Sequence, residues 1–215
     1  MNNVYMKRIF PLLLLLWAVQ ADAARRMRDV FAAMPDTVLT LMTKNNRLAC
    51  IAFIENNMEA KVRNRFDGQP VLRAMTDDYL DLQLTASCRV EMKLLPVADS
   101  VSYICMVRTY SSPEKESVVT LYTQDWKPLP ADKYLTPPAY KAFWTTNDTI
   151  DAPETERLQR LQDMHFVTAE LSRDSMLLTF RLQPACTDKD ESARMQAVLR
   201  PVVYAWRGGR FVPDL

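Results

Sequence analysis

The sequence predicts an α+β protein in which N-terminal helices precede an antiparallel meander sheet, and a second, smaller helix-plus-antiparallel-sheet unit follows. Three observations carry this prediction. Apolar residues recur at helical spacing between Leu48 and Val62. The period changes from Val71 onward, and from Leu80 apolar and polar residues alternate, as in a half-buried strand. Helical and then alternating patterns return after residue 153, so the order of helix and sheet occurs twice.

The first helical pattern covers residues 27–43 and breaks at Pro35. This proline suits the first turn of a new helix, because its missing N–H would be unpaired there anyway. Asn45 or Asn46 then offers an N-cap for a longer helix through Val62. We therefore expect the helices to end shortly before the first strand.

Four strands are expected next. Apolar residues alternate with polar ones over 80–84, and with charged ones over 88–94, which is typical of half-buried strands. Two further strands are expected at 101–110 and 117–123, with a polar loop between them. Together these segments predict an antiparallel meander.

A proline-rich stretch at 128–153 interrupts any regular strand ladder, apart from a short helical stretch at 139–144. Beyond it the pattern predicts a helix at 154–164. The strands expected after this helix are 166–172, 175–183 and 194–206, followed by a hairpin turn at Gly208-Gly209.

The two halves also share residue patterns. Residues 79–85 match 166–172, and residues 118–122 match 202–206, at offsets of 87 and 84. Preserved order with nearly equal offsets is typical of an internal duplication. The alternative is that any two amphipathic strands look alike.

The N-terminus has the pattern of a secretory signal peptide. Lys7 and Arg8 precede an apolar run at 9–19, and small residues place the cleavage site after Ala23. A membrane anchor needs about 20 apolar residues, more than this run has. The first cysteine is Cys50, so no lipobox cysteine lies at the cleavage point. We expect a periplasmic or secreted protein with no transmembrane segment in the mature chain.

The expected parts of the chain are a signal peptide at 1–23, a helix-plus-sheet unit at 24–127, a proline-rich connector at 128–153 and a smaller unit at 154–215.

Composition excludes several function classes. Three glycines are too few for a P-loop or a dinucleotide fingerprint. A single histidine removes zinc sites built on two or three imidazoles. With 27 Lys and Arg against 26 Asp and Glu, the chain lacks the excess charge that neutralises nucleic-acid phosphates. We therefore expect no cofactor, no metal site and no nucleic-acid partner.

The four cysteines, Cys50, Cys88, Cys105 and Cys186, would meet an oxidising compartment after export. Cys88 and Cys105 lie in consecutive expected strands, and one hairpin register places them opposite each other as a disulfide candidate. The neighbouring register pairs Cys88 with Val107 instead. The alternative is four free, buried thiols.

Several runs, denser in the first half of the chain, carry a family resemblance; they are residues 31–39, 43–48, 54–55, 60–62, 76–80 and 93–96. They resemble an uncharacterised family of exported proteins of unknown function from Bacteroidales bacteria. The resemblance covers most of the mature chain and implies a Gram-negative periplasm or cell surface. It implies no activity, substrate or catalytic residue.

Aromatic residues gather in and beside the connector; they are Trp126, Tyr134, Tyr140, Phe143 and Trp144. On a rigid surface, such rings stack on a glycan or anchor a protein partner. The alternative is that they pack between the two halves as core. Two or more rings open in one patch would favour binding.

No residue is predicted to be catalytic. His165 follows the expected helix at 154–164, where an imidazole suits a helix C-terminus better than a catalytic role. Carboxylates are plentiful, and two of them suffice for glycoside hydrolysis without any local motif. A carboxylate-dependent envelope hydrolase of glycosides or peptides is therefore the alternative function.

Asp148-Thr149-Ile150 resembles the Asp-Ser/Thr-apolar acceptor pattern of periplasmic O-glycosylation in Bacteroidales, which makes Thr149 a glycosylation candidate. The sequence as a whole favours a non-enzymatic periplasmic or surface module that binds an unknown protein or glycan partner through the connector and exposed strand edges. A structural or assembly factor of the envelope is a third alternative.

Overall fold

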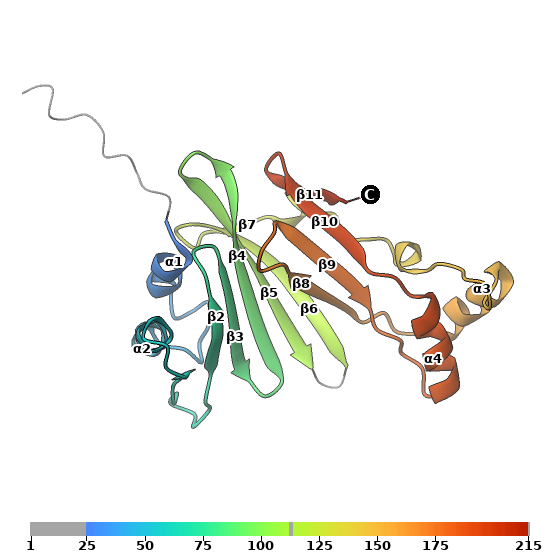
Figure 1. Cartoon of the computed structure of the whole chain (residues 1–215), viewed down its shortest axis with the longest axis horizontal. Coiled ribbons are helices and arrows are strands. Elements are labelled where there is room, and N and C mark those ends of the chain that lie inside the picture. The colour runs from blue at the N-terminus through green and yellow to red at the C-terminus, as the bar shows by residue number, and fades with distance from the viewer. Residues whose placement is uncertain (1–24, 112–113, 215) are drawn as a thin grey trace, which may run out of the picture.

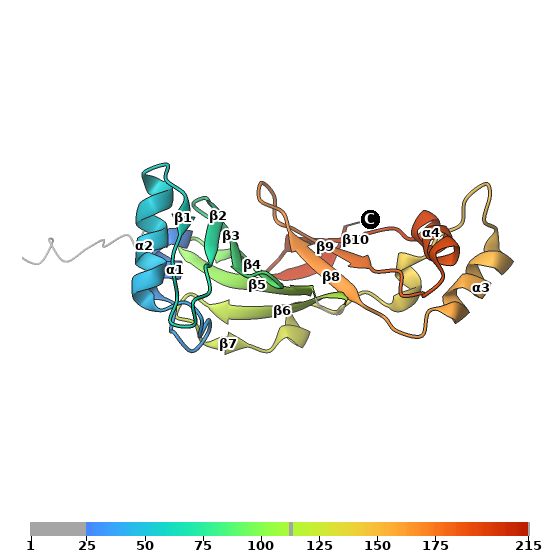
Figure 2. The ribbon, with the colours of Figure 1, turned by 90° about the horizontal axis from the view of Figure 1, so that it is seen from below.

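The computed structural model describes residues 25–111 and 114–214. Two antiparallel sheets, of seven and four strands, lie side by side, with helices at both ends of an elongated molecule (Figures 1 and 2). This arrangement confirms the α+β class. The expected signal peptide at 1–23 lies outside the described residues. Within those residues, no helix is long and apolar enough to cross a membrane.

Two helices open the described chain, α1 (Met27–Ala33) and α2 (Lys44–Glu55). A capping box starts α2. The hydroxyl of Thr43 accepts a hydrogen bond from the backbone N–H of Asn46, whose side chain accepts one from the backbone N–H of Thr43. The N-cap is thus Thr43 and not Asn45 or Asn46.

The expected helix boundaries are wrong in two further places. No helix starts at Pro35; the chain there leads into turns before α2. Helix α2 stops at Glu55 instead of Val62, because Asn57 adopts a left-handed conformation with φ of 56°.

The larger sheet is a meander in sequential order, as expected. Its strands are β1 (Ala60–Lys61), β2 (Val71–Met75), β3 (Tyr79–Thr85), β4 (Cys88–Ala98), β5 (Val101–Ser111), β6 (Lys115–Thr123) and β7 (Pro128–Leu129).

Both faces of the larger sheet are covered in part. Helices α1 and α2 pack on one face, against apolar side chains such as Leu80 and Met92. The second sheet packs on the other face, where β4 buries Glu91 and Lys93, each only 1% exposed. The ammonium of Lys93 donates to the backbone carbonyl of Arg173 at 2.7 Å and thereby links the two sheets.

The connector contains two short 3-10 helices, η2 (Ala131–Lys133) and η3 (Tyr140–Phe143). The second unit then comprises α3 (Ala152–Leu161), β8 (Val167–Leu171), β9 (Leu177–Leu182), α4 (Lys189–Val198), β10 (Val202–Arg207) and β11 (Arg210–Pro213). Its strand order is β11-β10-β9-β8. Gly208 and Gly209 form the β10–β11 turn with φ of 57° and 79°, which confirms the expected hairpin. Division of the chain at residues 127 and 153 stays a prediction.

The strand expected at 194–206 is wrong in its first half, which belongs to helix α4. The carboxylate of Asp188 caps this helix by accepting from the backbone N–H groups of Asp190 and Glu191. Met195 and Val198, three residues apart, are both fully buried on its inner face.

The expected internal duplication is also wrong, because strand order differs between the units. In the first unit, two strands separate β3 from β6, so β3 and β6 run antiparallel. In the second unit, only β9 separates β8 from β10, so these two strands run parallel, and α4 is inserted before β10. The shared residue patterns reflect amphipathic strands alone.

Candidate functional site

Three of the five aromatic candidates belong to the protein core. Trp126, Phe143 and Trp144 are 6%, 1% and 6% exposed. The indole Nε1 of Trp126 donates to the carbonyl of Val30 at 3.0 Å and so ties this ring to α1. Tyr134 is half-buried with its ring edge-on to Tyr103. The five rings therefore do not form an open stacking patch. Three of them pack within the core instead.

The fifth ring, Tyr140, stacks on His165 with the ring centroids 3.9 Å apart. Helix α3 ends at Leu161, so His165 lies beyond its last turn and the expected capping role is wrong. Instead, the imidazole lines a groove.

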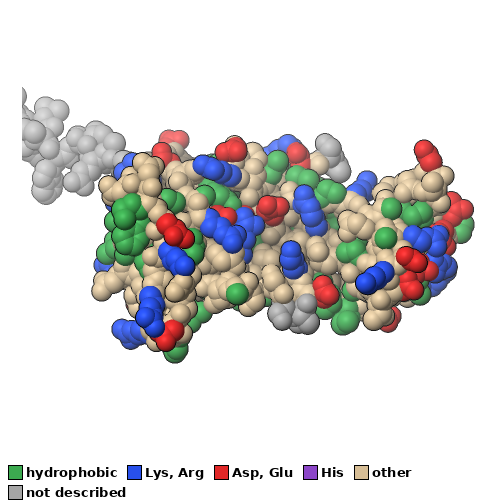
Figure 3. All heavy atoms as spheres, turned by 60° about the horizontal axis from the view of Figure 1, so that its bottom comes forward, with side chains coloured by type: hydrophobic (Ala, Val, Ile, Leu, Met, Phe, Trp, Pro, Cys, Tyr) green, Lys and Arg blue, Asp and Glu red, His purple; other side chains and the backbone are tan. Residues whose placement is uncertain are grey.

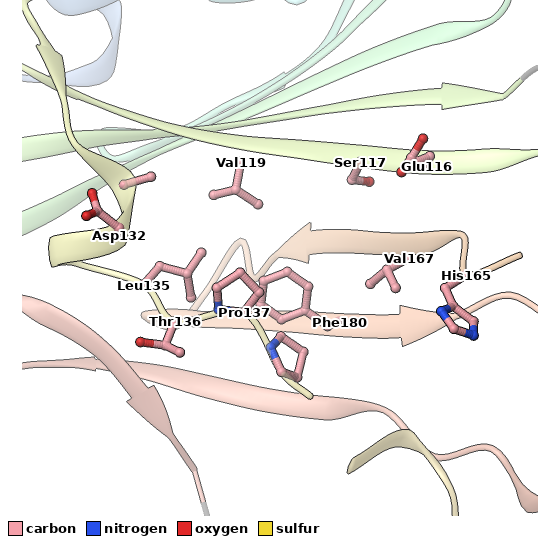
Figure 4. Close-up of a pocket in the computed structure, with 12 residues that line it drawn as sticks. Glu116, Ser117, Val119, Asp132, Leu135, Thr136, Pro137, His165, Val167 and Phe180 are labelled. Carbon is pink, nitrogen blue, oxygen red and sulfur yellow. The ribbon is translucent and has the colours of Figure 1, made fainter. Parts of the chain in front are cut away.

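This groove, which we call the connector groove, has a volume of about 500 Å³. It lies between β6, the second sheet and the connector (Figure 4). Strand β6 supplies Glu116, Ser117 and Val119; β9 and β8 supply Phe180 and Val167; the connector supplies Ala131, Asp132, Leu135, Thr136, Pro137 and Pro138. The sequence predicts a binding site in the connector, but on its aromatic residues rather than on the residues that line this groove.

The polar groups of the connector groove are separated by an apolar middle. Figure 4 shows Glu116 and His165 at one end and Asp132 and Thr136 at the other, with Val119, Pro137 and Phe180 between the two ends. A cavity of this size with a few polar groups is typical of a ligand site. Its two carboxylates lie at opposite ends, so the groove does not bring together the facing pair that the hydrolase alternative requires.

One edge of β6 runs beside the groove without a neighbouring strand. Strand β7 pairs with β6 only at Leu121 and Tyr122, so in the described part of the chain the edge from Lys115 to Thr120 has no β-sheet partner. Strand β8 crosses over β6 nearby without pairing, and the Ser117 hydroxyl lies 3.4 Å from the Ala169 carbonyl oxygen. Backbone groups on such an edge are free to pair with an extended chain.

A buried polar cluster lies deeper in the interface, on the face of the larger sheet that the second sheet covers. The Tyr79 hydroxyl donates to Glu91 Oε1 at 2.8 Å. The Arg89 guanidinium donates twice to Asp81, at 2.9 and 3.2 Å, and lies 3.2 Å from Glu91. Glu91 Oε2 is buried without a hydrogen-bond partner among the described residues. Burial raises the pKa of Glu91 to about 7, against the hydrogen bond from Tyr79 and the charge of Arg89, which lower it.

Glu91 and Asp81 are directly opposite in the β3–β4 ladder, which is the arrangement nearest to an acid–base pair. Glu91, however, is 1% exposed and Arg89 spans both carboxylates. A substrate does not reach Glu91 in this structure. We assign the cluster to the cohesion of the two sheets.

The expected pairing of Cys88 with Cys105 is wrong. Cys88 lies opposite Tyr110 and Cys105 opposite Lys93, and both thiols are free. The physical reason is the turn: β4 continues to Ala98 and β5 starts at Val101, which shifts the register away from the one that would join the two cysteines.

Two remaining predictions concern polar sites. Thr149 is exposed, and its hydroxyl donates to Asn147 Oδ1 at 2.9 Å. In residues 25–111 and 114–214, no group of three or more His, Cys, Asp or Glu side chains is arranged to hold a metal ion.

The fold and the groove define a class: an α+β protein in which two antiparallel sheets of unequal size share a core and flank a ligand-sized groove. The chain belongs to a family described as proteins of unknown function (DUF3256), whose model matches residues 19–211. This confirms the expected kinship with a family of unknown function.

The fold is similar to that of a solved structure. It is a domain of an uncharacterized protein from Porphyromonas gingivalis W83, with a TM-score of 0.73 and 24% sequence identity, covering 89% of this chain and 100% of that one. The comparison with curated proteins finds no match.

Proposed function

We propose that this protein is an exported, non-enzymatic binding module that holds an extended peptide segment of a protein partner in the connector groove. The observation that carries the proposal is the unpaired edge of β6 beside an apolar groove of about 500 Å³. An extended peptide would pair with the backbone of this edge and place alternate side chains in the groove.

The groove supports a peptide rather than a glycan. Glycan recognition draws on exposed aromatic rings, and Trp126, Phe143 and Trp144 are buried. A peptide instead uses main-chain hydrogen bonds for affinity and apolar pockets for specificity. Glu116 and His165 at one end, and Asp132 at the other, would set the direction of the bound chain.

The test is selection from a displayed library of random ten-residue peptides, followed by affinity measurement. Thr136 is exposed and lines the groove, so Thr136→Trp fills it without disturbing the core. Thr146, exposed and outside the groove lining, supplies the control Thr146→Trp. Selected peptides should bind the wild type and the control equally, and Thr136→Trp about tenfold more weakly or worse. Equal binding by all three, or no enrichment, would refute the proposal, and enrichment on a glycan array instead would favour the glycan alternative.

Export is proposed on the signal-peptide pattern that ends at Ala23. Expression of the full chain in a Gram-negative host, with fractionation and intact mass of the product, tests it. A periplasmic or secreted product beginning at Ala24 supports export, and a cytoplasmic product retaining residues 1–23 contradicts it.

Glycosylation of Thr149 is a separate proposal. In a native Bacteroidales host, added mass on Thr149 would support it, and the bare mature mass would exclude it.

A further inference from the structure

A second groove, of about 360 Å³, lies where the larger sheet faces β8 and β9. We call it the polar groove. It shares no lining residue with the connector groove, from which it is separated by the crossing of β8 over β6 at Ser117 and Ala169. Its lining contains two alanines, and every other side chain in it is charged, hydroxylated or an amide.

Three cations meet in the polar groove from three strands. Arg89 comes from β4, Lys115 from β6 and Arg181 from β9. The side chain of Arg89 is held in place by its two hydrogen bonds to Asp81, which leave its Nη1 group free of those bonds. In the described ranges, neither Lys115 nor Arg181 has a carboxylate within 4.0 Å. Figure 3 shows basic side chains, with acidic ones among them, across the middle of one face of the molecule.

Folding thus places two cations without a carboxylate partner, Lys115 and Arg181, in the lining of one groove together with Arg89, which Asp81 and Glu91 pair. Such an arrangement suits an anionic group, because charge-assisted hydrogen bonds from Arg and Lys to an oxyanion are about twice as strong as neutral ones. Glu170, also in the lining, is the one carboxylate there. It disfavours a ligand of high negative charge and offers an acceptor to a hydroxyl or ammonium group of the ligand.

We propose that the polar groove binds a small molecule bearing one oxyanion, a carboxylate or a phosphate, next to hydrogen-bond donors. The hydroxyl and amide groups of Thr109, Thr168 and Gln83 complete a polar wall around it. The volume is at the small end of the range for ligand pockets, about 300–1,000 Å³, which fits a single acidic sugar or hydroxy acid. This site is independent of the connector groove and of its peptide.

Calorimetric titration of the full mature chain tests the proposal with three probes. Glucuronate carries a carboxylate, glucose 6-phosphate a phosphate, and glucose neither. At least one acidic probe should bind with a Kd near or below about 1 mM, and glucose at least about tenfold more weakly. The acidic probe that binds identifies the oxyanion. Binding should weaken as sodium chloride is added, because salt screens exposed charges.

Variants locate the binding. Arg181 and Lys115 are exposed, so Arg181→Gln and Lys115→Gln should fold normally and each weaken binding about tenfold. Glu170→Gln should strengthen it. Arg210→Gln, at an exposed position on β11, is the matched control and should bind as the wild type does. The proposal is overturned if neither acidic probe binds better than glucose, or if the Arg181 and Lys115 variants both bind as the Arg210 control does.

Discussion

The indole Nε1 of Trp206 donates a 2.7 Å hydrogen bond to the backbone carbonyl of Pro96, across the two sheets. Trp206 lies on β10 of the smaller sheet and Pro96 on β4 of the larger one. The ring is 8% exposed and packs edge-on against Phe211 and Tyr103. One side chain therefore combines apolar burial and a polar tie at the same interface that forms the two grooves.

Replacing Trp206 tests whether this tie contributes to stability. Trp206→Phe keeps an aromatic ring but removes the donor, so we expect the free energy of unfolding in urea to fall by about 1–2 kcal/mol. Tyr110→Phe, at an exposed position on β5, is the control and should change it by less than about 0.5 kcal/mol. Equal stability of both variants would show that the bond is replaced by water without loss.

Arg47 on α2 is a buried arginine, 1% exposed, that organises the turns between α1 and α2. Its guanidinium donates to the backbone carbonyls of Phe31, Met34 and Met42 and to the carboxylate of Asp36. Arg47→Met leaves these acceptors without a donor, and we expect a loss of about 3–5 kcal/mol in the free energy of unfolding. Arg65→Met, at an exposed position, should have little effect. A loss below about 1 kcal/mol for Arg47→Met would mean that water replaces the guanidinium.

Glu91 should make stability depend on pH. Its pKa is raised by burial from an ordinary 4.5 to about 7, so the folded state holds this proton more tightly than the unfolded state. Stability from this group is therefore full below pH 4.5 and is lost as pH rises toward 7, by about 3 kcal/mol in total. Arg89, Asp81, Tyr79 and Glu170 surround the carboxyl and contribute to its titration.

Glu91→Gln removes this titration while keeping an acceptor for Tyr79. Urea unfolding between pH 4.5 and 8 should show a flatter profile than the wild type, with the variant gaining relative stability as pH rises. Glu59→Gln, at an exposed position, serves as control. Parallel profiles for wild type and Glu91→Gln would contradict the prediction.

The four thiols should differ in reactivity. Burial raises the pKa of Cys50 to about 11 and raises those of Cys88 and Cys105 as well, whereas Cys186 is only half-buried. Iodoacetamide should therefore modify Cys186 first in the native protein, since the thiolate is the reactive form. After unfolding without reductant, all four should be alkylated. A mass showing two fewer adducts would reveal a disulfide.

Alternation in the sequence predicted the strands of the larger sheet but not their surroundings. In β3, Leu80, Leu82 and Leu84 face the helical core, as their spacing indicates. In β4, the same alternation is typical of a strand with one solvated face, yet Glu91 and Lys93 are buried because the smaller sheet covers them. The pattern of a single strand predicts which of its side chains share a face. It does not predict which distant segment packs on that face.

The candidate site was predictable only in part. The prolines of the connector marked the segment that lines the connector groove, and Pro137 and Pro138 do line it. Its other wall, from β6, β8 and β9, depends on how two sheets pack, which no local pattern encodes. The aromatic rings were predicted to bind a partner, but three of the five are core residues, because a long chain buries most of its large apolar side chains. Helix α4 was missed because its polar residues outnumber the two it buries.

The unpaired edge of β6 is the structural feature on which the proposed peptide binding depends most directly. Hydrogen exchange of the backbone amides of residues 115–120 should be measured with and without a selected peptide. If the peptide pairs with this edge, exchange of the outward-facing amides there should slow at least about tenfold, as in any newly formed strand pair. Unchanged exchange along β6 in the peptide-saturated protein would contradict the account, because the peptide would then bind elsewhere.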